Sequence, residues 1–239
     1  DVRLHVADTA SGSSTYVAEF ENLGTGANTE ARLLLRTQAG SDNTDCYIGS
    51  LGSSANNSNL TFATETSGTL SEKVRIDSSG RLLVGTSSSL NTLGFAPNFQ
   101  VEGTSAGTSS GSFLRTSSDE NPAYLVLSKK RGSGNVSIGD NIGRLSFTGF
   151  DGANFLEAAS INCFVDGAVN TQNDMPGRLV FSTTADGANS TTERMRITNQ
   201  GATWAAVNTS VNLFGSTIHY HGWRQGSGSQ WVGSFVNEG

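Results

Sequence analysis

Apolar residues along this chain recur with two spacings, and both are typical of β-strands. In 73–76 and 194–197 cationic and apolar residues alternate, which is the period-two pattern of a half-buried strand with its cations outward. In 33–35 and 124–127 the apolar residues are continuous, as in strands that are covered on both faces. No apolar run approaches the roughly 18 residues of a membrane span. The pattern predicts an all-β protein without membrane insertion.

Composition favours strands and turns over helices. Ser, Thr, Asn and Gly supply 107 of the 239 residues, and these types prefer turns and caps or lose entropy in a helix. Helical bundles and coiled coils are therefore excluded. Disorder is the rival interpretation, but three Pro, twelve Phe and a net charge of −6 favour a folded chain. The excess of 21 acidic over 15 basic residues also disfavours nucleic acid as a partner.

The chain contains an internal repeat. Four segments in the first part of the chain match four later segments in residue type and order. The distance in sequence between matching segments grows from 92 to 121 residues along the chain. The matching pairs are 31–35 with 123–127, 46–48 with 163–165, 60–68 with 179–187, and 72–76 with 193–197. The jump in offset after the first pair predicts extra residues in the second copy. Residues 142–150 and 154–161, separated by a Gly-containing turn, have the pattern of such a hairpin.

We therefore predict a β module at 1–90, a related module at 98–208 with an added hairpin at 137–161, and a separate aromatic segment at 209–239. Cys46 and Cys163 fall at equivalent repeat positions, and we expect each to be a small buried hydrophobic residue rather than half of a disulfide. A thin module cannot cover the apolar runs around Leu34 and Val126 by itself. A partner chain is the expected cover.

The repeat motifs ERMRITNQG (193–201), GRLVFSTT (177–184) and EKVRIDSSGRLLVG (72–85) resemble repeats of tail fibres and related appendage proteins of tailed bacteriophages, particularly marine and cyanobacterial ones. The resemblance implies an intertwined parallel homotrimeric fibre in the virion tail, extracellular and in contact with other phage tail proteins. Members often carry a C-terminal self-cleaving chaperone domain, and nothing in 209–239 resembles one.

The aromatic segment supplies the candidate receptor contacts. Aromatic residues beside Arg and Gln, between glycines, suit stacking on sugar rings or an interface hot spot. The candidates are Tyr220, Trp223, Arg224, Gln230 and Trp231. They would contact a host surface glycan or an outer-membrane receptor. The alternative interpretation is a hydrophobic plug at the end of the trimer.

His219 and His221 are the candidate metal ligands. At positions i and i+2 of a strand both imidazoles point to one face, so three parallel chains would gather six nitrogens around the axis. Six nitrogens suit an octahedral metal such as iron, and the spacing resembles His pairs at some phage needle and spike tips. A His pair packed beside Trp223 without metal is the alternative. No other cofactor is expected.

Catalysis finds little support in the residues. A glycosidase needs two carboxylates about 5 to 9 Å apart, whereas the acidic residues are scattered along the chain. Three His and no Gly-x-Ser-x-Gly motif argue against a serine hydrolase. Asp-rich turns at 42–45 and 140–141 match no known calcium loop. We therefore expect a non-catalytic, structural and host-receptor-binding tail-fibre segment. A structural virion connector or decoration protein is the alternative, and a polysaccharide-depolymerising spike is a more distant one.

Overall fold

The computed structural model describes residues 20–26, 28–39, 42–54, 56–170 and 173–205, and the backbone of 211–213 and 216–218. These residues form strands, turns and irregular segments without a helix, which confirms the all-β prediction. None of the described residues belongs to a helix that could cross a membrane. The chain divides into two compact units, 1–112 and 113–239, and each is described by itself.

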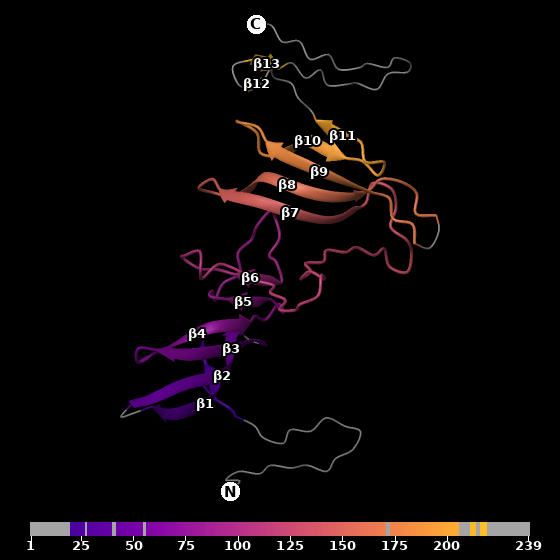
Figure 1. The fold of residues 1–239 in the computed structure, drawn as a ribbon. Coiled ribbons are helices and arrows are strands. Elements are labelled where there is room, and N and C mark those ends of the chain that lie inside the picture. The colour runs from indigo at the N-terminus through magenta and orange to yellow at the C-terminus, as the bar shows by residue number, and fades with distance from the viewer. Residues whose placement is uncertain are drawn as a thin grey trace. The chain divides into compact units, whose positions relative to one another are not determined.

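The first unit holds a six-stranded sheet with the strands in chain order (Figure 1). Neighbouring strands are antiparallel up to β5, and β6 pairs with β5 in parallel. The strands are β1 (Glu30–Ala39), β2 (Asp42–Ser54), β3 (Asn57–Thr66), β4 (Thr69–Ile76), β5 (Leu82–Val84) and β6 (Phe99–Val101).

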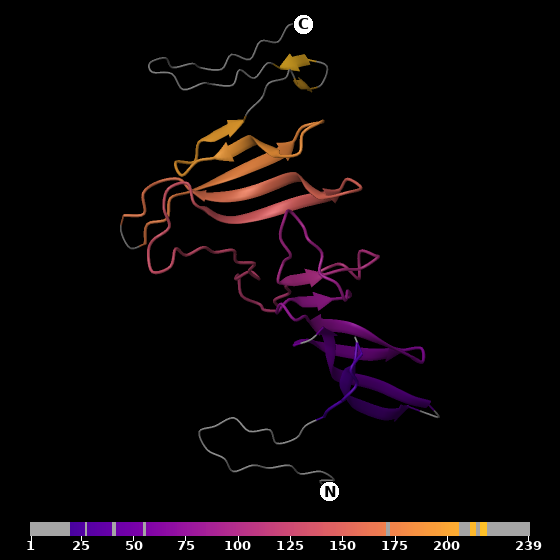
Figure 2. The same cartoon turned by 180° about the vertical axis from the view of Figure 1, so that it is seen from behind.

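The second unit holds a five-stranded antiparallel sheet, again in chain order, which Figure 2 shows from behind. Its strands are β7 (Asn141–Phe150), β8 (Phe155–Val165), β9 (Gly177–Thr184), β10 (Thr191–Ile197) and β11 (Thr203–Ala205). A separate pair, β12 (Val211–Leu213) and β13 (Ser216–Ile218), follows.

The two sheets repeat one another most closely from the third strand onward. Leu60 pairs with Ile76 in the first sheet, and the repeat-equivalent Leu179 pairs with Ile197 in the second. Each pairing skips one residue of the fourth strand, Lys73 in β4 and Arg194 in β10. Residues 60–85 and 179–205 therefore share strand order, register and a β-bulge, so the repeat is structural and not only one of composition.

The turn after this bulged strand is also repeated. The backbone N–H of Gly80 donates to the Asp77 carbonyl, and that of Gly201 donates to the Thr198 carbonyl. Both glycines have a φ of 79°, in the left-handed region that side chains other than glycine rarely adopt. The glycine in each motif is therefore needed for the same backbone turn.

The predicted hairpin is present as β7 and β8, but it is not an addition to the second module. It holds the place in the strand order that β1 and β2 hold in the first sheet. Leu33 pairs with Ile48, and Leu145 pairs with Ile161 in the same way. Residues 123–127, which we aligned with β1, form no strand. The alignment of 31–35 with 123–127 was wrong because short apolar runs are alike in sequence, so such a run does not identify one particular strand.

Strand register also sorts the side chains into two unlike faces, because directly paired residues point to the same side of a sheet. The buried side chains among the described residues of the first sheet all lie on one face, together with charged side chains; we call it the polar face. They are Tyr47, Asn59, Thr61, Ala63 and Leu83. The opposite, apolar face is largely exposed in the single chain. This reverses the expectation of outward cations, since the Arg75 side chain is 12% exposed and the Ile76 residue 40%.

Candidate assembly surface and polar clusters

The apolar face of the first sheet carries a continuous set of aliphatic side chains. One cross-strand row runs through Leu33, Ile48, Phe62, Val74 and Val84. Six large aliphatic residues of this face keep about 36% to 50% of their surface exposed, although they belong to strands. These exposed residues are Leu33, Leu35, Ile48, Leu60, Ile76 and Leu82. A contiguous apolar surface of this kind marks an interaction site.

The second sheet presents the equivalent face. Its row runs through Leu145, Ile161, Phe181, Met195 and Ala205, which take the places of the row in the first sheet. Leu145, Phe147 and Leu179 are again more than two-fifths exposed. The same surface is thus built twice from one repeat.

On the polar face of the first sheet, the Glu30 carboxylate is almost covered. Thr61 Oγ1 donates to Glu30 Oε1 at 2.7 Å, and Arg32 Nε donates to Glu30 Oε2 at 2.7 Å. The Arg32 guanidinium also lies 4.3 Å above the centre of the Tyr47 ring. Burial raises the pKa of Glu30, but the hydrogen bonds from Thr61 and Arg32 outweigh that effect and leave the pKa below its usual value.

The β-bulge explains the Glu-x-x-Arg spacing of the repeat. In a regular strand, residues i and i+3 point to opposite faces. The bulge at Lys73 brings Glu72 and Arg75 to the same face, where Arg75 Nη2 donates to Glu72 Oε2 at 2.7 Å. The bulge in β10 does the same for Glu193 and Arg196, also at 2.7 Å. The two motifs therefore encode an ion pair within one strand that only a bulged strand can form.

A second buried carboxylate, that of Glu157, lies on the polar face of the second sheet. Arg144 Nε donates to Glu157 Oε1 at 2.9 Å, and Thr191 Oγ1 donates to Oε2 at 3.0 Å. Burial raises the pKa of Glu157, and hydrogen bonds from Ser146, Arg144 and Thr191 lower it by more, so that its pKa lies below the usual value. The carboxylate remains ionised and ties three strands together.

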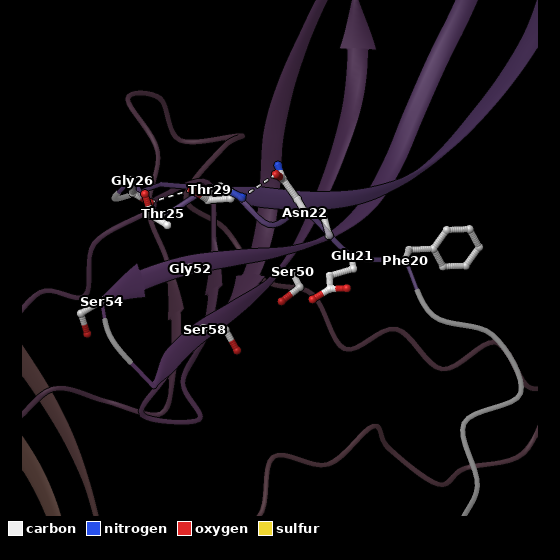
Figure 3. A pocket seen from close by; sticks show the side chains of 12 residues that line it. Phe20, Glu21, Asn22, Thr25, Gly26, Thr29, Ser50, Gly52, Ser54 and Ser58 are labelled. Carbon is white, nitrogen blue, oxygen red and sulfur yellow. Dashed lines mark hydrogen bonds between the residues drawn. The ribbon is translucent and has the colours of Figure 1, made fainter.

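A hollow of about 590 Å³ lies beside the first sheet, between the segment that precedes β1 and the ends of β2 and β3 (Figure 3). Its lining combines hydroxyl groups of Ser50, Ser54 and Ser58 with the carboxylate of Glu21 and the exposed ring of Phe20. Among the described residues, no His, Cys, Lys or Arg lines the hollow, and Glu21 is the one carboxylate. The described part of the lining therefore lacks the carboxylate pair of a glycosidase.

This arrangement of sheets matches known structures. The carboxy-terminal domain of the bacteriophage T5 L-shaped tail fibre aligns with it over 100% of both chains, with a TM-score of 0.62 and 15% sequence identity. The chain has a phage tail-fibre fold. A structure of the same T5 domain with its intra-molecular chaperone domain aligns over 99% of this chain and 68% of that chain, with a TM-score of 0.55 and 14% identity. No protein-family model and no curated protein sequence matches the chain.

The tail-fibre fold confirms the resemblance that the repeat motifs indicated, although those motifs cover only part of the sequence. The candidate receptor and metal residues all lie outside the described residues: His219, Tyr220, His221, Trp223, Arg224, Gln230 and Trp231. Their roles stay predictions. Among the described residues, no cluster of three or more His, Cys, Asp or Glu side chains could hold a metal.

In this tail-fibre fold Asp45, near the start of β2, and Asp140, just before β7, are each paired with cationic side chains. Arg36 donates two hydrogen bonds of 2.8 Å to Asp45. Lys129 and Arg131 both donate to Asp140, and Arg131 makes the largest contribution to lowering the pKa of Asp140. These carboxylates act as structural ion-pair partners.

The cysteines are free and half-buried, but they are not equivalent in the fold. Cys46 pairs with Leu35, whereas Cys163 pairs with Gly143. In the register that the two sheets share, Cys163 lies four residues beyond the position in β8 that corresponds to Cys46. Sequence reasoning also missed the buried carboxylates. Glu157 and its partner Arg144 are thirteen residues apart on different strands, so no local spacing indicates their contact.

Proposed function

We propose that this chain is a structural, host-binding segment of a phage tail fibre, which assembles as a parallel homotrimer in the virion tail and contacts other tail proteins. The observation that carries the proposal is the pair of apolar faces. A lone chain exposes its aliphatic side chains on both sheets and buries charged and polar ones, which is the arrangement expected of a chain whose core is completed by other copies. The tail-fibre fold of both units supports the same role.

Sedimentation of the full chain tests the trimer directly. We expect a mass near three times the chain mass of 24.9 kDa at micromolar concentration and below. A mass of one chain would overturn the trimer. Three copies that place their apolar faces around one axis would remove both sheets' aliphatic rows from water at once, so the trimer should persist at micromolar concentration.

Receptor contact is proposed for the aromatic segment, by binding and not by catalysis. The support is its composition, because aromatic residues beside Arg224 and Gln230 suit sugar rings or an outer-membrane protein surface. Adsorption of the labelled full chain to host cells should fall for Trp223→Ala and Trp231→Ala. It should not fall for Leu23→Ala, which removes a similarly large and 80% exposed apolar side chain elsewhere. Equal adsorption of all variants would refute this assignment.

The depolymerase alternative makes a different prediction for the same cells. A depolymerase incubated with host polysaccharide releases new reducing ends, whereas a binding segment leaves their number unchanged. The hollow beside the first sheet supports the binding interpretation, since Glu21 is the one carboxylate among the described residues of its lining. Release of reducing ends that is lost on replacing an Asp or Glu of this chain would favour the spike.

A further inference from the structure

The segment that leads into the second sheet carries the most exposed large apolar side chains of that unit's described residues. Five of them, at two places in 113–126, keep 65% to 87% of their surface exposed, above the values on the sheet faces. They are Phe113, Leu114, Tyr124, Leu125 and Val126. Figures 1 and 2 show no strand between β6 and β7, although 123–127 has the composition of a strand.

The backbone of this segment is also unpaired. Within the described residues, no hydrogen bond reaches the N–H or C=O groups of 122–130. Consecutive apolar residues in an extended segment point to both of its sides. Once both sides are covered, water can no longer hydrogen-bond to the backbone N–H and C=O groups. The segment lacks both a strand neighbour and a cover.

One end of the segment is fixed on its own unit. Lys129 Nζ and Arg131 Nε donate to Asp140 at 2.9 and 2.6 Å, just before β7 begins. A Cβ atom on Gly143 would lie 2.7 Å from Cβ of Leu127. Because Cβ directions stand perpendicular to a sheet, Leu127 lies over the face of β7 and not beside its edge. The segment therefore does not run along the edge of its own sheet.

The edge of β7 is the complementary surface. In the described chain β7 is the last strand of its sheet, and it hydrogen-bonds to a neighbour on the β8 side only. It is ten residues long, and Leu145, Phe147 and Phe150 are exposed along it. A long apolar edge of this kind is a template for pairing with another strand. The other end of the same sheet, β11, is three residues long and offers far less backbone.

We propose that residues 122–128 of one chain pair along the β7 edge of a second copy and add a sixth strand to that copy's sheet. The inference rests on the proposed trimer, since symmetry places equivalent units of parallel copies at the same level of the fibre axis. Pairing with β7 gives the backbone N–H and C=O groups of the segment hydrogen-bond partners. If the segment instead lay flat on an apolar face, these groups would be buried without partners. Tyr124 and Val126 then cover one side of the added strand and Leu125 the other, in keeping with a strand that is apolar on both faces.

Cross-linking between two differently tagged chains tests the pairing, in a Cys46→Ser, Cys163→Ser background. One chain carries Val126→Cys, and the other carries a cysteine in turn at 146, 147 and 148 of β7, so that a small difference in register does not hide the contact. We expect a covalent species containing both tags after mild oxidation of the trimer, because paired strands bring Cα atoms within disulfide range. The control partner carries Thr203→Cys on β11, where no covalent species should form.

The outcomes separate this pairing from the trimer itself. A trimer that gives no two-tag species with any β7 cysteine overturns the pairing and leaves the trimer standing, whereas absence of a trimer overturns both. A second measurement does not depend on register. Val126→Pro removes a strand donor and should raise trimer dissociation roughly tenfold or more, while Val126→Thr should not. Equal dissociation of both variants would also contradict strand addition.

Discussion

Leu33 and Leu34 provide a matched test of which face of the first sheet is the assembly surface. They are consecutive in β1, with 43% and 44% of their surface exposed, and they point to opposite faces. Leu33 pairs with Ile48 on the apolar face, and Leu34 pairs with Tyr47 on the polar face. An aspartate at position 33 would be buried between chains of the trimer, whereas one at position 34 would lie near Arg32 and Arg36.

The size of the effect follows from the exposed surface. Complete burial of a large aliphatic side chain contributes about 1.5–3 kcal/mol, so covering the six exposed aliphatic residues of this face is worth about 4–7 kcal/mol per chain. Leu33→Asp loses about 1 kcal/mol of that contribution and adds the cost of burying a carboxylate, several kcal/mol. A total of about 3 kcal/mol per chain, multiplied over three chains, corresponds to a loss of about 10⁶-fold in trimer stability.

Sedimentation across a dilution series is the assay. We expect Leu33→Asp to sediment as a single chain at micromolar concentration, Leu34→Asp to remain a trimer, and Leu33→Asn to lie between them because it buries a polar but uncharged group. A trimeric Leu33→Asp variant would refute the assignment of the apolar face. Dissociation of both aspartate variants to the same extent would show that the two faces are not distinguished in the assembly.

Three further predictions concern the ion pairs and the candidate metal site. In chemical denaturation, Glu72→Gln should lower the free energy of unfolding by about 1–2 kcal/mol and Glu193→Gln by about 0.5 kcal/mol. The difference is expected because the Glu72 and Arg75 side chains are 21% and 12% exposed, whereas those of Glu193 and Arg196 are 36% and 37% exposed. The pKa of Glu157 is lowered by folding, so its contribution to stability is present above pH 4.5 and is lost as the pH falls through the lowered value; Glu157→Gln should flatten that part of the acid unfolding curve. Protein purified without a His-tag or chelator should contain about one iron per three chains if His219 and His221 bind it at the trimer axis, and elemental analysis well below that ratio rejects the site.

The all-β fold and the shared register of 60–85 and 179–205 could be predicted because alternation and turn residues act locally. Residues 73–76 show the limit of that reasoning. Their alternation separates two faces correctly, but it does not say which face remains open to solvent in one chain. Bulges add a second limit. The residue skipped in β4 places Glu72 on the same face of the sheet as Arg75, and the period-two pattern of a regular strand does not predict this.

Assignment of the candidate site from sequence is limited by contacts between distant strands. The position of Glu157 depends on a bulge in β8 and on Arg144 in β7, and neither is visible in a local spacing. The unpaired state of 122–130 is equally invisible, since its composition is that of an ordinary strand. What distinguishes it from β1 is the absence of a neighbour in the described chain, and only the strand order reveals that.

The shared register restricts where insertions and deletions are tolerated in this chain. Thr66 and Thr69 close the hairpin between β3 and β4 with two residues between them, while Thr184 and Thr191 close the equivalent hairpin in the second sheet with six residues between them. A change of one residue within a strand would turn every later side chain to the opposite face and bury the charged row between chains. Lengthening at the hairpin tips leaves both faces intact, so these tips are the places where a peptide tag or a foreign loop can be inserted without disturbing assembly.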